Sequence, residues 1–373
     1  MAISKINTIF ATYNNNNNIL PPFDMTKLSI IVPVYNVEQY IRPCFESIFK
    51  QGLDENEYEV IIVNDGSTDK SMEMISDIIS QHNNITIINQ ENQGLSVARN
   101  NGIKIAKGYY IFMPDSDDLL IENSLSPLLD QALKTKVDII AADFIKMEDE
   151  EIAHYKHVPQ KEITYTEKTG EQLFLEDLNP HQCYVWRSLF RRGFITENNL
   201  RFYPGIRYQD VPFTHECYLK AGRCLKTTLL LNIYRRRHGS ATFFFRLSKA
   251  RDFSIAVAQT WKLTYLDGLS PKLLKKLKED VYISLTMLIY LIAHDDSPFS
   301  EKRKVISFLK ELAPDISFND GIKQRLYSLF YQKRPMTLVY FRYLYGIIVD
   351  EAIRPTYKSI KNKFSNNNLL KLR

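Results

Sequence analysis

The chain of 373 residues has few of the features that define several protein classes. Glycine occurs only 13 times, which excludes collagen-like and linker-dominated proteins. The four cysteines contain no C-x-x-C pair, and their spacing fits neither a zinc site nor a disulfide framework, so reduced thiols are expected. The N-terminus lacks the apolar core of a signal peptide. The longest mainly apolar run, Val281 to Ala293, is too short to span a bilayer.

Positive charge is concentrated near the C-terminus. Residues 321–373 contain 11 Lys and Arg against two acids, a net charge of +9 within a total of +5. Tyr and Phe are interleaved with these cations, a pattern typical of a helix on anionic lipid. A helical bundle that buries its aromatics in a homodimer is an equal alternative. No recognition motif for nucleic acid accompanies the charge. A cytoplasmic protein is expected, with peripheral contact to the inner face of the membrane as one alternative.

Short apolar runs alternate with amphipathic segments from Leu28 to Phe144. Five strands are expected, at LSIIVPV, YEVIIVND, ITIINQ, YYIFMP and VDIIAADF, each of the first four followed by a helix. This order predicts an α/β fold with a mostly parallel sheet flanked by helices. From about Leu247 the chain is expected to be helical to its end. A sheet of this kind binds ligands beyond the carboxyl ends of its strands.

Two of the expected strands end in acidic residues. Asp65 follows VIIVN, and Asp115, Asp117 and Asp118 follow YYIFMP. A tight turn with a helix cap is the favoured explanation of Asp65 taken alone, and capping of the next helix explains one of the other three acids. Three crowded carboxylates are better explained by a hard divalent cation, Mn²⁺ or Mg²⁺. Such a cation, held by few protein ligands, shares its coordination shell with phosphate oxygens.

Four segments, in this order and spacing, resemble the family 2 glycosyltransferases of the GT-A fold: SIIVPVYNVEQYIRPCFESI, VIIVNDGSTD, NQGLSVARNNGI and FMPDSDD. The resemblance covers residues 28–143 closely and continues more loosely to about residue 242. It implies inverting transfer of a sugar from a nucleotide-diphosphate-sugar, typically a UDP-sugar, to an acceptor hydroxyl. The acceptor would be a glycan or a lipid-linked saccharide in the biosynthesis of a glycan or cell-surface polysaccharide. Mn²⁺ or Mg²⁺ would be the cofactor.

The resemblance also implies roles for residues around the nucleotide. Pro33 and Tyr35 would lie in the loop that lines the nucleoside pocket. Asp65 would accept a hydrogen bond from the base. Arg99 falls where the family places an arginine beside the nucleotide, and an ion pair with one of the strand-end acids is an equal alternative.

The metal ligands implied by the resemblance come from two segments. Asp115-Ser116-Asp117 would be the D-x-D motif, with Asp117 as the direct ligand of the metal and Asp115 nearer the ribose. His238, in YRRRHGSAT, would be a further ligand, although a structural role is commoner for a lone histidine. The arginines before it would neutralise the departing diphosphate, or form a solvated face.

The resemblance assigns the catalytic base to Asp210. The family usually has a Glu-Asp pair here, and this chain has Gln209-Asp210. Asp210 would take the proton of the acceptor hydroxyl as its oxygen attacks the anomeric carbon. An N-cap of the following helix is the competing interpretation of Asp210 alone.

These expectations divide the chain into three regions. Residues 1–26 would be a disordered leader that contains NNNNN. Residues 27–245 would form the GT-A domain, with a nucleotide-binding part over 27–143 and an acceptor part over 144–245. Residues 246–373 would form the helical, basic C-terminal region.

Two other functions remain open at this point. A non-catalytic subunit that binds a nucleotide-sugar or a glycan is one, because Gln209 replaces the usual Glu. A D-x-D phosphatase with Asp115 as its nucleophile is the other, although that function does not explain VIIVNDGSTD or NQGLSVARN.

Overall fold

The computed structural model describes residues 26–157, 160, 162–180, 182–236 and 247–347, and it divides the chain into two compact units. Within the described residues, the first unit contains residues up to 176, 184–204 and 220–236. The second contains 177–183, 205–219 and 247–347. Each unit has a hydrophobic core of its own. The expected leader, His238 and the last part of the basic C-terminal region lie outside the described residues.

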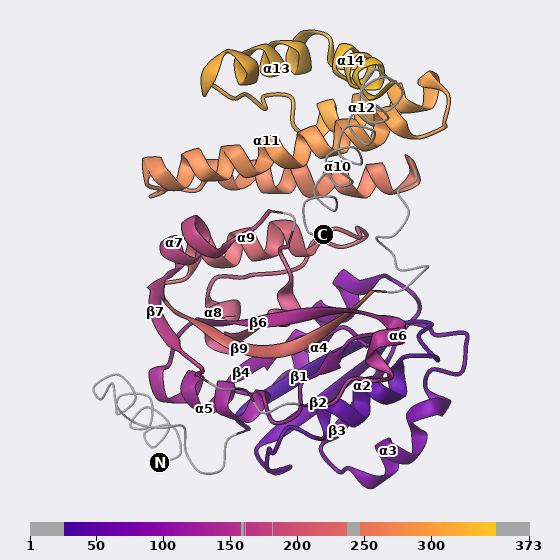
Figure 1. Cartoon of the computed structure of the whole chain (residues 1–373), viewed down its shortest axis with the longest axis vertical. Helices are drawn as coiled ribbons and strands as arrows, with labels where there is room; N and C mark the ends of the chain where they lie inside the picture. Colours follow the sequence, from indigo (N-terminus) through magenta and orange to yellow (C-terminus); the bar gives the residue numbers. More distant parts are fainter. Residues whose placement is uncertain (1–25, 158–159, 161, 181, 237–246, 348–373) are drawn as a thin grey trace, which may run out of the picture. The chain divides into compact units, whose positions relative to one another are not determined.

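The first unit is built on a nine-stranded mixed sheet (Figure 1). Its order is β3, β2, β1, β4, β8, β6, β9 and β5, with β7 also paired to β9. The strands are β1 (Leu28–Val34), β2 (Tyr58–Asn64), β3 (Ile85–Asn89), β4 (Tyr110–Phe112), β5 (Leu119–Leu120), β6 (Ile139–Glu148), β7 (Tyr165–Thr169), β8 (Ser188–Arg191) and β9 (Arg223–Arg236).

One half of this sheet is parallel, as the sequence predicts. β1 pairs in parallel with β2 and β4, and β2 pairs in parallel with β3. All seven residues of β1 are buried, which is typical of a strand covered on both faces. The predicted α/β fold class is confirmed. Because these strands are parallel, the carboxyl ends of β2 and β4 lie at the same edge of the sheet.

The other half of the sheet differs from the predicted parallel order. β8 lies between β4 and β6 and is antiparallel to both, so β6 is not a neighbour of β4. β9 runs parallel to β6 and antiparallel to β5 and β7. β8 contributes only four residues, SLFR, and so short a segment shows no hydrophobic periodicity that a sequence could reveal.

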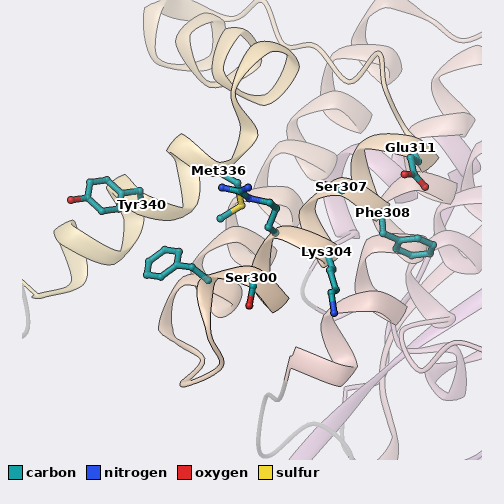
Figure 2. Close-up of a pocket in the computed structure, with 9 residues that line it drawn as sticks. Ser300, Lys304, Ser307, Phe308, Glu311, Met336 and Tyr340 are labelled. Carbon is teal, nitrogen blue, oxygen red and sulfur yellow. The ribbon is translucent and has the colours of Figure 1, made fainter.

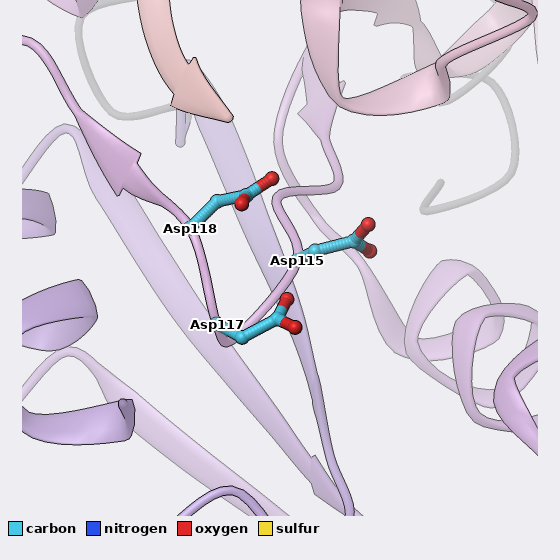
Figure 3. A group of neighbouring side chains, drawn as sticks. All are labelled: Asp115, Asp117 and Asp118. Carbon is cyan, nitrogen blue, oxygen red and sulfur yellow. The ribbon is translucent and has the colours of Figure 1, made fainter. Parts of the chain in front are cut away.

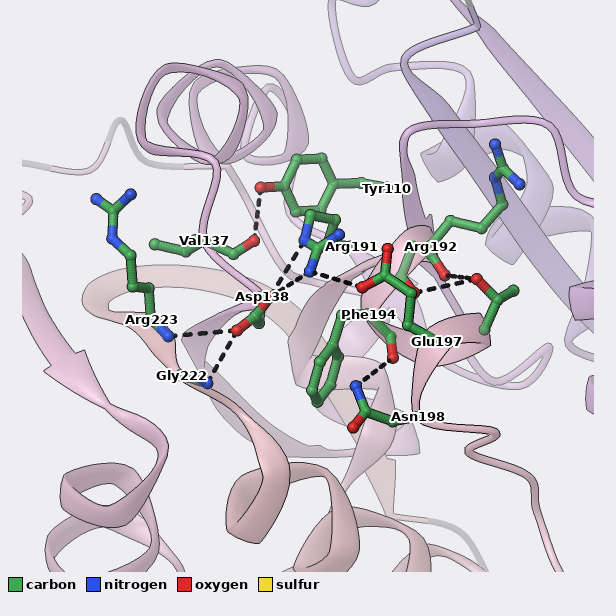
Figure 4. A network of polar contacts seen from close by, with 12 residues as sticks. Tyr110, Val137, Asp138, Arg191, Arg192, Phe194, Glu197, Asn198, Gly222 and Arg223 are labelled. Atoms are coloured by element: carbon green, nitrogen blue, oxygen red, sulfur yellow. Dashed lines mark hydrogen bonds and ion pairs between the residues drawn. The ribbon is translucent and has the colours of Figure 1, made fainter. Parts of the chain in front are cut away.

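A polar network around Asp138 holds the mixed half together (Figure 4). The Arg191 side chain donates to Asp138 Oδ1 from Nη2 at 2.7 Å and from Nε at 3.1 Å. The backbone N–H groups of Gly222 and Arg223 donate to Asp138 Oδ2 at 2.9 and 3.3 Å. One carboxylate therefore joins the start of β6 to the end of β8 and the start of β9.

The helices of the first unit flank the sheet and are short. They are α2 (Ile41–Ile48), α3 (Ser76–Gln81), α4 (Leu95–Ile105), α5 (Leu125–Thr135), α6 (Asp149–Ile152), α7 (Gly170–Gln172) and α8 (Arg192–Glu197). The elements η1 (Glu73–Ile75) and η3 (Val185–Arg187) are 3₁₀ helices, and η2 (Leu173–Asp177) is a π-helix.

Helix α4 packs against β1 and β2 at close range. A Cβ atom at Gly102 would lie 2.3 Å from Cγ2 of Ile31, a separation that two carbon atoms cannot adopt. The glycine therefore allows the backbone of α4 to approach the sheet. This close packing also fixes the distance from the sheet of Arg99, which lies one turn earlier on the same helix.

The second unit is helical, as predicted for the chain after Leu247. Its helices are α9 (Asp210–Lys220), α10 (Leu247–Lys262), η4 (Leu263–Tyr265), α11 (Pro271–His294), α12 (Phe299–Leu312), α13 (Gly321–Lys333) and α14 (Pro335–Ile347). Figure 1 shows α10 and α11 side by side, and buried residues of α10, α11, α12, α13 and α14 share one core. None of the helices in the described residues is long and apolar enough to cross a membrane.

None of the four cysteines forms a disulfide, as their spacing predicts. Cys44, Cys183, Cys217 and Cys224 are all buried.

Candidate active site

Three carboxylates gather at the carboxyl end of β4. The ligand atoms of Asp115, Asp117 and Asp118 all lie within 4.8 Å of one another, and Figure 3 shows the three side chains extending to the same side of their loop. A tight turn brings them together, in which the N–H of Asp118 donates to the carbonyl oxygen of Asp115 at 3.2 Å. The predicted acidic cluster therefore exists.

Asp118 is the buried member of this cluster. Its exposed fraction is 3%, and its Oδ2 atom has no hydrogen-bond partner among the described residues. Burial raises the pKa of Asp118 well above its usual range, and the charges of Asp117 and Asp115 raise it further. A buried carboxylate oxygen without a partner is costly. A bound divalent cation would remove that cost, so the three residues fit the metal that the sequence implies.

Asp118 is not a helix cap, which was one interpretation of the acids. The chain forms β5 directly after it, and the next helix, α5, has Ser124 as its N-cap. The capping explanation of the acidic cluster is therefore wrong.

Arg235 holds the acidic loop from the neighbouring end of β9. Its backbone N–H donates to Asp118 Oδ1 at 2.9 Å, and its Nε donates to the carbonyl oxygen of Asp117 at 2.8 Å. Its guanidinium forms an ion pair with Asp149 and lies 5.1 Å from the ring centroid of Tyr40. Arg235 is only 8% exposed, so its side chain is buried in these contacts. The sequence singled out this basic segment but not the contact with Asp117.

Arg99 forms the ion pair that was one alternative for it. The side chain is fully buried, and its Nη2 lies 2.6 Å from Asp115 Oδ1. The guanidinium also lies 5.2 Å from the ring centroid of Phe202. Because Asp115 is thereby fixed on one side, Arg99 orients the first carboxylate of the cluster. Its predicted place beside the nucleotide stays a prediction.

Asp65 is buried at the end of β2 and organises the loop before α4. Its Oδ1 accepts hydrogen bonds from Gln90 Nε2 and from the backbone N–H of Gln93, both at 2.8 Å. Its Oδ2 accepts the N–H of Gly94 at 2.8 Å. Asp65 is therefore held at the same sheet edge as the acidic cluster, with β1 between β2 and β4.

The two residues predicted to line the nucleoside pocket differ in setting. Pro33 lies within β1, opposite Val63 of β2, and not in a loop as expected. Tyr35 follows the end of β1 and is 47% exposed. Only Tyr35 is thus placed by the structure in the segment beyond the strand.

Asp210 belongs to the second unit, as the first residue of α9. The neighbouring Gln209 is 2% exposed, and its Nε2 donates to Asp210 Oδ1 at 3.2 Å. Gln209 therefore restrains the carboxylate as a neutral donor, where the family's Glu would be a second acid.

A second cluster of reactive residue types lies deeper in the second unit. Cys183 Sγ is 3.7 Å from His215 Nδ1, and His215 Nε2 is 3.5 Å from Asp280 Oδ2. The order resembles a nucleophile, a base and an acid. Burial raises the pKa of the Cys183 thiol well above its usual value, however, and both other side chains are fully buried. A raised pKa disfavours the thiolate, which is the reactive form, so the cluster is interpreted as structural.

Trp186 is 1% exposed and part of an aromatic cluster. Its ring stacks on Tyr184 at 4.7 Å and on Tyr234 at 5.6 Å, and Phe144 meets it edge to face at 4.9 Å. Core packing therefore explains the tryptophan.

The arrangement defines a class: a GT-A type sheet with an acidic cluster at the carboxyl edge of its parallel half. Solved structures with this fold include residues 1–349 of Staphylococcus aureus TarS in complex with UDP-GlcNAc. That structure matches with a TM-score of 0.60 and 19% identity, over 85% of this chain and 89% of the other.

The sequence comparisons agree with this class. A family model described as "Glycosyl transferase family 2" matches residues 29–196. Glycosyltransferase GlyG of Streptococcus pneumoniae is 30% identical over 66% of this chain and 84% of its own length. The uncharacterized glycosyltransferase EpsJ of Bacillus subtilis is 37% identical over 58% of this chain, and the match spans 62% of its length. The chain belongs to glycosyltransferase family 2.

Proposed function

We propose that this chain transfers a sugar from a nucleotide-diphosphate-sugar, a UDP-sugar, to an acceptor hydroxyl with inversion at the anomeric carbon. The acceptor would be a glycan or lipid-linked saccharide in the biosynthesis of a surface polysaccharide, on the cytoplasmic side. The names of similar proteins support this class of product. One is a poly(ribitol-phosphate) beta-glucosyltransferase of Bacillus spizizenii, and TarS carries UDP-GlcNAc in its solved complex.

The observation that carries the proposal is the buried oxygen of Asp118 without a partner, beside Asp115 and Asp117. Asp117 and Asp115 would hold Mn²⁺ or Mg²⁺. When bound, the metal would supply positive charge for the departing diphosphate. Arg99 pairs with the Asp115 carboxylate and Arg235 donates to the backbone carbonyl oxygen of Asp117, so the chain itself provides an ordered acidic loop.

The nucleoside would bind along the same sheet edge. Asp65 would accept a hydrogen bond from the base, with Pro33 and Tyr35 beside it. The three hydrogen bonds that Asp65 already accepts fix its position before any nucleotide arrives. This would reduce the ordering cost of binding.

Asp210 would act as the general base towards the acceptor hydroxyl. The hydrogen bond from Gln209 Nε2 to Asp210 Oδ1 would orient the carboxylate for this step. His238 as a further metal ligand is part of the proposal only through the family resemblance.

The donor and the metal can be tested together by thermal shift. Candidate nucleotide diphosphates and their sugars are added to the purified chain with and without Mn²⁺. We expect the matching nucleotide with Mn²⁺ to raise Tm, and Asp117→Ala to abolish the metal-dependent part of the rise. Asp130→Ala, in helix α5, is the control and should respond as wild type does. The absence of any shift with common nucleotides would contradict the proposal.

A substitution at Asp210 distinguishes an enzyme that transfers the sugar from a protein that only binds the donor. Asp210→Asn should reduce sugar transfer by roughly 10²–10⁴-fold, the usual contribution of a general base, and leave the donor-induced Tm shift unchanged. Glu216→Gln, on the same helix, should leave both unchanged. If Asp210→Asn keeps full biological activity, a non-catalytic binding subunit is the better explanation. The anomeric configuration of the product, read by NMR, tests inversion.

A further inference from the structure

Exposed apolar side chains concentrate in the last two described helices. Seventeen large hydrophobic side chains are exposed in the described residues, and eight of them lie between residues 322 and 345. We define the α13–α14 face as Ile322, Leu326, Leu329, Phe341, Leu344 and Tyr345. So strong a concentration in two short helices exceeds the scattered exposure that is normal for a protein surface.

The apolar residues of this face follow helical spacing. Ile322, Leu326 and Leu329 lie at positions i, i+4 and i+7 of α13, and therefore on one side of it. Ile322 is 78% exposed. The ring of Phe330 meets that of Phe341 at 5.9 Å, which joins α13 to α14. Phe341 is itself 56% exposed, so an exposed aromatic ring lies where the two helices meet.

The same segment carries only positive charge. Residues 321–347 contain five Lys and Arg and no Asp or Glu. Lys323, Arg325, Lys333 and Arg334 are exposed. The sequence continues with six further Lys and Arg against two acids in residues 348–373. The apolar side chains are thus accompanied by cations that lack acidic partners within the segment.

A groove of about 900 Å³ runs between α12 and α14 beside this face (Figure 2). Tyr340, which neighbours Phe341, lines it together with Phe299, Arg303 and Lys304. Glu311 is the acidic residue of its lining. Aromatic rings and cations around one hollow suit a charged headgroup with an apolar tail.

We propose that the α13–α14 face lies on the surface of an anionic lipid bilayer. Its apolar side chains enter the boundary between headgroups and acyl chains, and the exposed cations of the same segment pair with lipid phosphates. Tyr340 and Tyr345 suit this depth because tyrosine is enriched at membrane interfaces. Each helix has only 13 residues, against the roughly 20 needed to span the hydrocarbon, so the helices rest in the interface.

The charge argues against the main alternative, a second copy of the chain. In a two-fold dimer through this face, the cations of one copy would meet those of the other. No acid within residues 321–347 could compensate them. A lipid surface supplies the missing negative charge and accepts the aliphatic side chains at the same time.

The test is co-sedimentation of the purified full-length chain with vesicles. One set contains phosphatidylcholine alone, and the other an equal mixture of phosphatidylcholine and phosphatidylglycerol. We expect binding to the mixed vesicles and not to the neutral ones. Two double variants are compared with wild type. One carries Leu326→Asn with Leu329→Asn, and the other carries Lys333→Glu with Arg334→Glu. Each should lower the affinity for the mixed vesicles by about tenfold or more.

Matched controls place equal changes elsewhere on the surface. Ile87→Asn with Ile105→Asn removes two similarly exposed apolar side chains of the first unit, and Lys104→Glu with Lys107→Glu reverses two exposed charges there. Both controls should bind vesicles as wild type does.

Four outcomes would overturn the proposal. These are no binding to the mixed vesicles, equal binding to neutral vesicles, face variants that bind as wild type does, or a dimer that Leu326→Asn with Leu329→Asn dissociates. The vesicle assay does not depend on sugar transfer. The donor-induced Tm shift is measured on the same variants, so either proposal can fail while the other stands.

Discussion

Among single residues, Asp118 gives the clearest physical reason for a bound cation. Asp115 has Arg99 as an ion-pair partner, whereas Oδ2 of Asp118 is buried with no hydrogen-bond partner in the described part of the chain. The acidic run itself could be predicted from the sequence, together with its place at a strand end. The burial of its last member could not, because it depends on β9 and Arg235, which lie more than a hundred positions later.

We predict that Asp118→Asn stabilises the metal-free protein. The pKa of Asp118 is raised, so the folded state favours the neutral carboxyl, and the ionised form costs free energy above that pKa. At pH 7 an asparagine should increase the free energy of unfolding and keep an oxygen to accept the Arg235 N–H. The gain should shrink as the pH falls through the raised pKa.

Thermal denaturation with EDTA and with Mn²⁺ measures both parts of this prediction. The Mn²⁺-induced rise in Tm should be smaller in Asp118→Asn than in wild type. Asp117→Asn serves as the comparison, since its half-buried side chain should lose the metal response without an equal gain in stability. A metal-free Asp118→Asn protein less stable than wild type would contradict the argument.

We predict that Arg235→Met weakens metal binding without touching the metal. The substitution removes the Nε–H that holds the Asp117 carbonyl and the charge paired with Asp149. The Mn²⁺ concentration for half-maximal thermal shift should rise about tenfold, a coupling of about 1.4 kcal/mol. Arg236→Met is the matched control, because Arg236 is exposed and pairs with Glu148. An unchanged Mn²⁺ dependence in Arg235→Met would rule out the positioning role.

Among the helices and strands, the sequence predicts the parallel half of the sheet and misses β9. The strands β1 to β4 are short runs rich in apolar residues, and hydrophobic patterning identifies them. β9 reads RCLKTTLLLNIYRR, with Thr227, Asn232 and Arg235 buried among its aliphatic residues. These polar residues interrupt the hydrophobic pattern of the strand. Arg235 is buried because it donates a hydrogen bond to the Asp117 carbonyl oxygen in the acidic loop. Among the strands that the hydrophobic pattern failed to identify, β9 thus carries a residue that holds the candidate site.

We predict that Gly102→Ala destabilises the protein although alanine favours helices. A Cβ at this position would lie 2.3 Å from Cγ2 of Ile31, and the cost of overpacking, about 1–3 kcal/mol, should exceed the gain in helix propensity, about 1 kcal/mol. Denaturant unfolding measures the difference. Gly222→Ala is the control, since its Cβ would meet only Asp138 Oδ2 at 3.5 Å. A stabilised Gly102→Ala protein would show that α4 can shift freely on the sheet.

For the whole molecule, the two units alternate along the chain. Residues 205–219 belong to the second unit, although the sequence gives no composition change there. Within that unit, His215 of α9 and Asp280 of α11 form a buried pair, and Asp280 also pairs with Lys276. The hydrophobic pattern of the sequence predicts a boundary near residue 246, where the helices begin. It does not predict ion pairs between distant residues such as His215 and Asp280, because these pairs leave no local pattern in the sequence.

We predict that a chain ending at residue 246 does not fold to a stable, soluble protein. It would keep α9 and lose the core of α10 to α14, so His215 and Ile206 would lose their buried surroundings. Soluble yield and circular dichroism test this against the full chain. Asp280→Asn in the full chain should cost about 3–5 kcal/mol, as removal of one partner from a buried pair does. Glu279→Gln is its control. A stable, cooperatively unfolding 1–246 chain would contradict the prediction.

The burial of all four cysteines has a practical consequence. A folded chain offers no accessible native thiol to a maleimide, and burial raises the pKa of Cys44 and Cys183 well above the ordinary value. A single cysteine introduced at Ile322 or Tyr35 would therefore react selectively, with no need to replace the native ones. An environment-sensitive fluorophore at either position could then report lipid or nucleotide directly in real time.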